Sequence, residues 1–304
     1  MIVAAPLVSV VIPHHNDSDT LAAALNSALG QNVSDLEVIL VDDASTENID
    51  GIVAGIGDSR LRIIRHDRNR GAGAARNTGV AAARGEFIAF LDADDSWDPA
   101  KLERQLSAIG KGDGAHRASC CAFLLLRPDG RWELHTPQSH DDWYRYLLWG
   151  CDLSPGSTLL VRRSTFNEIG PFDEGFRRLE DWDWLLRFAS RFSLAPVAEP
   201  LARIRPGSPP DSKIAAAALE RFAEKNLPLA DARGPSARRQ LLAALRLERS
   251  AISYRDGQYA RALAILLWSL LLYPRRNKEF YARMFHQLGR VARGAIRRIA
   301  SLTR

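Results

Sequence analysis

The sequence contains few sulfur residues and no long apolar runs. Its three cysteines, Cys120, Cys121 and Cys151, are odd in number and lack Cys-x-x-Cys spacing. They argue against a disulfide framework or a zinc site and indicate buried thiols in a reducing compartment. The longest apolar run, near Leu263–Tyr273, is too short to cross a bilayer. No basic stretch precedes the apolar N-terminal residues, so we expect no signal peptide and a cytoplasmic protein.

Acidic residues are scarce in the last third of the chain. Residues 201–304 hold 21 Lys and Arg against 7 Asp and Glu, a net charge of +14. The first 200 residues hold 20 basic and 29 acidic residues, a net charge of −9. This asymmetry predicts two regions with different partners. The acidic region would need a divalent cation to bind a phosphate ligand, and the basic region suits anionic lipid, nucleic acid or an acidic partner.

Apolar strands alternate with amphipathic helices over the first 110 residues. The expected strands are Leu7–Ile12, Glu37–Val41, Leu61–Arg65 and Phe87–Leu91. The expected helices are Thr20–Leu29, Ile49–Ile56, Gly73–Ala83 and Pro99–Ile109. This alternation predicts an α/β fold with a parallel sheet that is covered by helices on both faces.

The pattern changes after residue 119 and again after residue 204. Turn residues at Pro128–Gly130 predict a hairpin, which makes the sheet mixed. The other elements expected before residue 205 are the helices Asp141–Leu148 and Asp181–Phe192 and the strand Ser157–Val161. A Pro-rich linker at Arg205–Pro210 divides the chain into domains 1–204 and 205–304. The second domain is expected to be helical, with a tetratricopeptide-like hairpin at Ala251–Pro274.

Polar clusters follow three of the four predicted strands. They are His14–Asn16, Asp42–Asp43 and Asp92–Asp95. Ligands of open parallel sheets bind outside the carboxyl ends of the strands, so these clusters are expected at one edge. The closely spaced carboxylates of the third cluster suit Mg²⁺ or Mn²⁺ together with a substrate phosphate. Capping of the following helix is the alternative, and it is the favoured interpretation for Asp98.

Two further motifs have both a functional and a structural interpretation. Gly71–Asn77 superficially resembles a dinucleotide fingerprint, but Arg76 stands where the third glycine would be. Arg76 could reach a base or a diphosphate, or it could be a solvated residue at a helix start. In Glu180–Trp184, a carboxylate beside tryptophans suits a general base and a sugar-binding wall. Acidic residues at a helix start also favour the helix dipole.

Taken together, four blocks resemble glycosyltransferase family 2, which has the GT-A fold. The blocks are VSVVIPHHN, EVILVDDAST, GAGAARNTGVAAARGEFIAFLDADDSWDPAKLERQ and GSTLLVRRSTFNEIGPFDEGFRRLEDWDWLLRFA. Their order and spacing agree with the family over about residues 7–204. The last hundred residues lie outside the resemblance.

The resemblance implies inverting transfer of a sugar from a nucleotide diphosphate donor, UDP being the expected nucleotide. The metal Mn²⁺ or Mg²⁺ would be held by Asp94 and Asp92, and Asp181 would be the catalytic base. His15 stands where the family commonly has Tyr or Phe. The implied nucleotide-binding residues are Pro13, His15, Asn16, Asp43, Arg76 and Asp92. The candidate acceptor-binding residues are Glu180, Trp182 and Trp149.

The C-terminal stretch Tyr281–Thr303 has apolar residues at helical spacing and several arginines. Such a helix either lies on an anionic membrane surface, at the inner face of the cytoplasmic membrane, or packs internally. Nucleic acid is not expected, because aromatic residues do not alternate with the basic ones. The expected partners are a nucleotide-sugar donor and a glycan or lipid-linked acceptor. The alternatives are a non-catalytic nucleotide-sugar or glycan-binding protein of the same fold and a dinucleotide-dependent oxidoreductase, which the missing third glycine disfavours.

Overall fold

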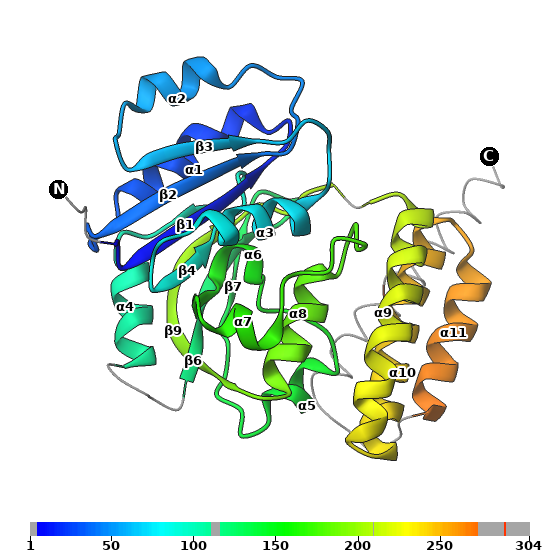
Figure 1. The fold of residues 1–304 in the computed structure, drawn as a ribbon. Helices are drawn as coiled ribbons and strands as arrows, with labels where there is room; N and C mark the ends of the chain where they lie inside the picture. Colours follow the sequence, from blue (N-terminus) through cyan, green and yellow to red (C-terminus); the bar gives the residue numbers. More distant parts are fainter. Residues whose placement is uncertain (1–4, 111–115, 209, 273–288, 290–304) are drawn as a thin grey trace, which may run out of the picture. The chain divides into compact units, whose positions relative to one another are not determined.

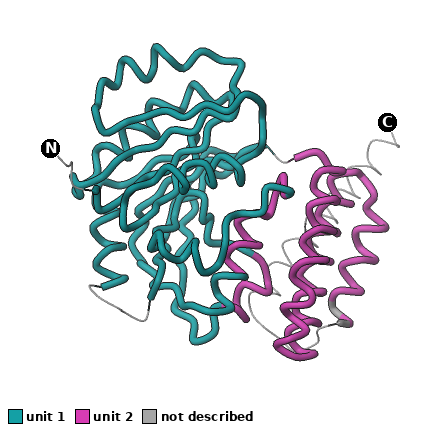
Figure 2. The backbone as a smooth tube through the Cα atoms, viewed as in Figure 1, with its two compact units in different colours: residues 1–143, 151–175, 187–208 teal, residues 144–150, 176–186, 209–304 magenta. Residues whose placement is uncertain are grey.

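The computed structural model describes residues 5–110, 116–208, 210–272 and 289, and these fall into two compact units (Figure 2). The first unit is formed by residues 1–143, 151–175 and 187–208. The second is formed by residues 144–150, 176–186 and 209–304. The linker predicted at residues 205–210 falls where the chain passes from the first unit to the second. Two short earlier segments also belong to the second unit.

The first unit is built on a mixed nine-stranded sheet (Figure 1). Its strand order is β3-β2-β1-β4-β8-β6-β9-β5, and β7 pairs with β6. The strands are β1 Val8–His14, β2 Leu36–Asp42, β3 Leu61–Arg65, β4 Phe87–Phe90, β5 Ser96–Trp97, β6 His116–Leu126, β7 Trp132–His135, β8 Leu160–Arg162 and β9 Ser193–Ile204. β1, β2, β3 and β4 are parallel, whereas β8 joins β4 and β6 antiparallel.

The parallel half of the sheet agrees with the predicted alternation of strands and helices. All seven residues of β2 are buried, as expected for a strand covered on both faces. Helix α3 approaches β1 so closely that a Cβ on Gly79 would lie 2.2 Å from Val11 Cγ1. The helices of this half are α1 Ser18–Leu29, α2 Asp50–Ile56, α3 Ala72–Ala82 and α4 Lys101–Ile109.

Three features of the first unit differ from the predicted elements. The long strand β9 and the two-residue strand β5, which pair with each other, were not predicted. Ser157, expected to begin a strand, lies instead in the short helix α6 Pro155–Thr158, and β8 begins at Leu160. The unit also contains α7 Thr165–Ile169. Pro196 and Pro200 weaken the local strand signal of β9, which forms through its long-range parallel pairing with β6.

The second unit is helical, as predicted for the chain after residue 204. Its longer helices are α9 Ser212–Ala232, α10 Pro235–Arg255 and α11 Tyr259–Leu272. Helices α5 Trp143–Leu147 and α8 Glu180–Ala189 lie largely in this unit. No helix within the described ranges is both long and apolar enough to cross a membrane. The predicted basic helix Tyr281–Thr303 lies outside the described residues, apart from Gly289.

A buried lysine gives the first unit a distinctive dependence of stability on pH. Lys101 Nζ donates to Gln105 Oε1 at 2.7 Å and lies 3.9 Å from the centre of the Trp97 ring. Burial lowers the pKa of Lys101 from 10.5 to about 8. Between these values the unfolded chain binds the proton more strongly, so this group's contribution to stability rises with pH.

We therefore expect the wild type to gain stability relative to the variant Lys101→Met as the pH increases. The gain in the free energy of unfolding between pH 7 and pH 10 should be about 2 kcal/mol. Urea denaturation of both proteins at several pH values measures it. A stability difference that stays constant with pH would show that Lys101 does not change its charge in this range.

Candidate active site

The predicted polar clusters lie at the carboxyl edge of the parallel strands. The parallel register pairs His14 at the end of β1 with Asp42 at the end of β2. It also pairs Val11 with Phe90, the last residue of β4, so that Asp92 follows at the same edge. The parallel pairing therefore places the three clusters at one edge, although their residues are up to 81 positions apart in the sequence.

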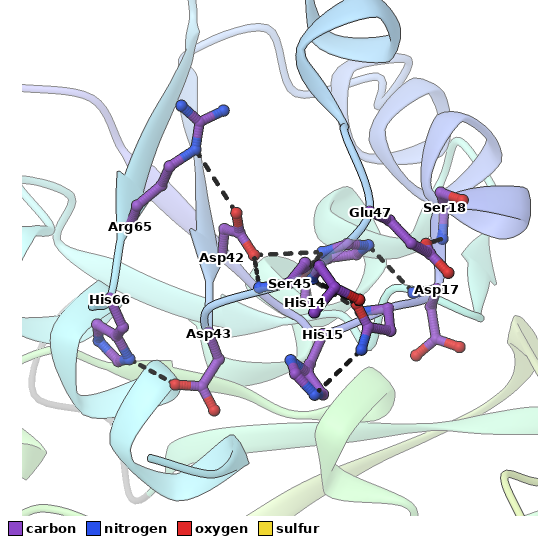
Figure 3. A network of polar contacts seen from close by, with 12 residues as sticks. His14, His15, Asp17, Ser18, Asp42, Asp43, Ser45, Glu47, Arg65 and His66 are labelled. Atoms are coloured by element: carbon purple, nitrogen blue, oxygen red, sulfur yellow. Dashed lines mark hydrogen bonds and ion pairs between the residues drawn. The ribbon is translucent and has the colours of Figure 1, made fainter. Parts of the chain in front are cut away.

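Asp43 is buried and accepts four hydrogen bonds at this edge, of which Figure 3 shows the one from His66. The donors are the backbone N–H of Arg70 to both carboxylate oxygens, at 2.8 and 3.1 Å, and that of Gly71 at 2.7 Å. The His66 ring nitrogen Nδ1 lies 2.6 Å from Asp43 Oδ1, and its Nε2 lies 2.9 Å from Thr78 Oγ1. Asp43 thereby fixes the loop that leads from β3 into α3.

His66 was missing from the predicted site. It follows β3 directly, just as the other clusters follow β1, β2 and β4. This position in the sequence is the signal that could have identified it. The ring joins the end of β2, the end of β3 and helix α3 through Asp43 and Thr78.

Asn16 joins two loops at the same edge. Its side-chain Oδ1 accepts from the backbone N–H of Thr46 at 2.8 Å and from Thr46 Oγ1 at 3.2 Å. His14 is buried, with its Nδ1 3.1 Å from Ser45 Oγ. His15 is exposed, and Pro13 is half-buried near the end of β1. Of these residues, His15 has the ring that is most accessible to a ligand.

Arg76 and Asp92 form an ion pair in the first unit. Arg76 lies near the start of α3 and is 5% exposed, and its Nη2 lies 2.7 Å from Asp92 Oδ1. The guanidinium carbon also lies 5.9 Å from the centre of the Phe172 ring. The backbone of Gly156 closes over this pair, because a Cβ there would lie 2.3 Å from Asp92 Oδ2 and 2.9 Å from Arg76 Nη2.

Two carboxyl groups next to Asp92, those of Asp94 and Asp95, hold their protons more tightly than free aspartates do. Burial, and next the charge of Asp92, raise the pKa of Asp94 to about 6 and that of Asp95 to about 8. Asp95 is held in place by Ser157 Oγ and by the backbone N–H of Arg205, 2.8 Å away. Ser157 Oγ also accepts from the backbone N–H of Asp92 at 3.0 Å.

This set of oxygen donors fits a divalent cation that retains waters and substrate phosphates. The described residues contain no group of three or more His, Cys, Asp or Glu side chains that could hold a metal ion. Mg²⁺ commonly takes one or two protein carboxylates and completes its shell with water and phosphate. Asp94 and Asp92 provide two carboxylates, and the raised pKa of Asp94 indicates that added positive charge would be favourable there.

Left-handed backbone conformations occur beside the predicted site residues. Among the described residues, the non-glycine residues with positive φ are Asn16, Ala44, Ser154 and Leu179. Ala44 follows Asp43, Leu179 precedes Glu180, and Ser154 begins the turn that carries Gly156. Such conformations cost free energy for residues with a Cβ and tend to occur at functional sites.

The remaining predicted residues belong to the second unit. Asp181 lies in the first turn of α8, partly buried, and its Oδ1 accepts from the backbone N–H of Trp182. Trp182 stacks on Phe222 with ring centres 4.2 Å apart, and its Nε1 donates to the Leu147 carbonyl at 2.7 Å. Glu180 and Trp149 are also buried. Both tryptophans therefore contribute to the interior of the second unit.

Comparison with known proteins identifies the family. A family model described as "Glycosyl transferase family 2" matches residues 9–170, more than half of the chain. The chain belongs to glycosyltransferase family 2. The matched region of this glycosyltransferase runs from β1 to the end of α7 and includes Asp43, Arg76, Asp92 and Asp94.

Named relatives of this family 2 glycosyltransferase are bacterial. It is 46% identical over 101 residues to the succinoglycan biosynthesis protein ExoO of Rhizobium meliloti (strain 1021), covering 33% of this chain and 29% of ExoO. It is 39% identical over 107 residues to the Escherichia coli "UDP-Glc:alpha-D-GlcNAc-diphosphoundecaprenol beta-1,3-glucosyltransferase WfgD", covering 35% of this chain and 42% of WfgD. These matches span less than half the length of either relative.

The crystal structure of S. aureus TarS 1–349 in complex with UDP-GlcNAc shares the fold of this glycosyltransferase. The TM-score is 0.62 at 18% identity, and the match covers 94% of this chain and 88% of that one. This likeness confirms the predicted GT-A type fold with its helical C-terminal region. The matched part extends beyond the region that the family model covers.

Proposed function

We propose that this protein transfers a sugar from a UDP-linked donor to a hydroxyl group of a glycan or glycolipid, with inversion at the anomeric carbon. The observation that carries the proposal is the pair Asp92 and Asp94 at the carboxyl edge of the sheet in a chain of this family. The names of relatives support a nucleotide-sugar donor, because WfgD is a UDP-Glc glucosyltransferase and TarS was crystallised with UDP-GlcNAc.

Each side chain then has a separate task. Asp43 and His15 contact the nucleobase, and Arg76 holds Asp92 beside the ribose while its charge faces the donor phosphates. Asp94 and Asp92 would hold Mn²⁺ or Mg²⁺, which stabilises negative charge on the leaving diphosphate. Asp181 accepts the proton of the acceptor hydroxyl as its oxygen attacks the anomeric carbon. Inversion follows because the attack comes from the face opposite the diphosphate.

We propose a lipid-linked acceptor at the inner face of the cytoplasmic membrane. The name of WfgD places a diphosphoundecaprenol-linked sugar among the acceptors of the relatives, and ExoO is named for succinoglycan biosynthesis. The net charge of +14 in residues 201–304 would favour a surface of anionic lipid. Glu180, Trp182 and Trp149 were predicted as acceptor contacts, but all three side chains are buried, so we propose that they support the acceptor side of the site from within the second unit.

A donor screen tests the proposed function. Thermal shift and hydrolysis are measured against UDP-, GDP- and dTDP-sugars, with and without Mn²⁺, and against NAD(H). We expect stabilisation by a UDP-sugar that depends on Mn²⁺, and slow release of UDP. Donor binding with neither hydrolysis nor transfer to any acceptor would favour the non-catalytic binding protein. A response to NAD(H) alone would refute a glycosyltransferase.

Substitution of Gly156 should damage the site while leaving the fold intact. In Gly156→Ala the new Cβ displaces the flexible ends of Asp92 and Arg76 and breaks their ion pair. We expect donor kcat/KM to fall at least about tenfold, since a charged hydrogen bond contributes about 1.5–3 kcal/mol. The melting temperature should change little. The matched control is Gly55→Ala in α2, where a Cβ meets no atom within 4 Å and activity should be unchanged.

Removal of the His66 ring should weaken donor binding through Asp43. We expect His66→Ala to raise the donor KM about five- to tenfold, because Asp43 loses a hydrogen bond that holds it. The kcat should change less than KM. His66→Asn keeps a nitrogen donor near Asp43 and should restore most of the affinity. Equal loss in both variants would argue that the ring itself, and not its bond to Asp43, matters.

A further inference from the structure

The outer face of helix α11 carries a continuous stripe of exposed apolar side chains. Its large members are Leu263, Leu267, Trp268 and Leu271, which are 39%, 50%, 58% and 79% exposed. They recur at spacings of three and four residues, so they share one face of the helix. We call these four residues the α11 stripe.

The opposite face of α11 packs on α10. Ala262 and Leu266 are fully buried. Ser269 Oγ donates to the Ala243 carbonyl at 2.9 Å, and Ser250 Oγ donates to the Ala262 carbonyl at 2.8 Å. The register of α11 on α10 is therefore fixed, and the stripe cannot turn inward without breaking these bonds.

The two helices that form and support the stripe are basic. Residues 235–255 and 259–272 together contain six Arg against one Glu. From α10, the guanidinium of Arg246 lies 4.1 Å from the centre of the Trp268 ring. Arg246 thus places a positive charge directly beside the apolar stripe.

We propose that the α11 stripe binds the surface of an anionic lipid bilayer. Leucines and a tryptophan flanked by arginines match the division of a bilayer interface into acyl chains and anionic headgroups. The 14 residues of α11 are about 21 Å long, less than the roughly 30 Å of a hydrocarbon core, so the helix lies in the plane of the interface. This inference rests on the proposed membrane location of the enzyme and names the helix that makes the contact. It can be tested without measuring sugar transfer.

Electrostatics disfavours a second copy of the chain as the occupant. A two-fold contact through the stripe would bring Arg246 and the other arginines of α10 and α11 from both copies close together, where they repel. Four side chains also present little of the area, about 800 Å² per partner, that stable protein interfaces bury. A bilayer supplies acyl chains that can bury the apolar stripe and anionic headgroups that can pair with the arginines beside it.

Vesicle flotation with the full chain tests the proposal. The probes are vesicles of pure phosphatidylcholine and vesicles with 30% phosphatidylglycerol, at low and high salt. The triple variant Leu267→Asn, Trp268→Asn and Leu271→Asn removes most of the stripe. The matched control is Leu134→Asn on β7, which is 56% exposed and lies in the first unit. Donor-induced thermal shift is measured on every protein.

We expect the wild type and the control to bind anionic vesicles, and the triple variant to bind at least about tenfold more weakly with an unchanged donor response. Wild-type binding should fall with salt and with loss of phosphatidylglycerol.

Equal vesicle binding by the triple variant would overturn the proposal. So would a lower melting temperature with unchanged vesicle binding, which would mean that the stripe is covered within the chain. If the triple variant has a smaller mass than the wild type in light scattering and binds vesicles equally well, the stripe binds a second copy of the chain and the proposal is overturned. Failure of the donor response alone would count against the proposed function and leave this inference intact.

Discussion

Asp181→Asn should abolish sugar transfer and leave the protein folded. Asparagine fills the same volume but cannot accept the proton of the acceptor hydroxyl. General-base catalysis contributes about 10²- to 10⁴-fold, and we expect kcat to fall by about 10³-fold with the donor KM nearly unchanged. Rates of transfer to a lipid-linked acceptor, together with donor binding by calorimetry, measure the two effects separately.

Asp183 on the same helix provides the contrasting variant. Its carboxylate is fully buried and accepts from Asn226 Nδ2 at 3.0 Å and Lys225 Nζ at 3.3 Å. Asp183→Asn should therefore lower the melting temperature, whereas Asp181→Asn should not. Full transfer activity in Asp181→Asn would show that another residue is the base. A donor affinity that falls as much as kcat would show that Asp181 binds the donor.

Asp94→Asn is expected to remove the response to Mn²⁺ and to reduce kcat/KM by about 10²-fold or more. The carboxylate is the proposed ligand of the cation that stabilises the leaving diphosphate. Without metal the variant should be more stable than the wild type above pH 6. The sign follows from the pKa of Asp94, which burial and next Asp92 raise to about 6, so that the charged form destabilises the folded state.

Asp98→Asn is the matched control for Asp94→Asn. Asp98 is exposed and accepts from the backbone N–H of Ala100 at 3.0 Å, which makes it a cap of the turn before α4. The Asp98→Asn variant should retain the Mn²⁺ dependence of the wild type. EDTA should abolish the transfer activity of the wild type, and added Mn²⁺ should restore that activity. Activity of Asp94→Asn that still requires Mn²⁺ at the same concentration would exclude Asp94 as the ligand.

The parallel half of the fold could be predicted because its signals are local. Runs such as VSVVI and EVILV are apolar except for one residue each, and helical periodicity lies between them, so the order of strands and helices along the chain could be predicted. The last segment of the sheet could not be predicted in this way. β9 contains Pro196 and Pro200, and its pairing with β6 shifts register near Cys121 and Ala122. Such a strand is stabilised by pairing with residues 76 to 79 positions earlier in the chain, and it carries little local periodicity.

The sequence by itself determined the alternation of strands and helices, the carboxyl-edge position of three polar clusters, and the uneven charge of the chain. These depend on residue order and side-chain chemistry alone. Only the tertiary structure decided that Arg76 pairs with Asp92, that His66 holds Asp43, and that Trp182 packs on Phe222. Each of these contacts joins residues from different elements, and its free energy depends on a distance that no local pattern encodes. The same reason applies to α11, because only its packing on α10 shows which leucines remain exposed.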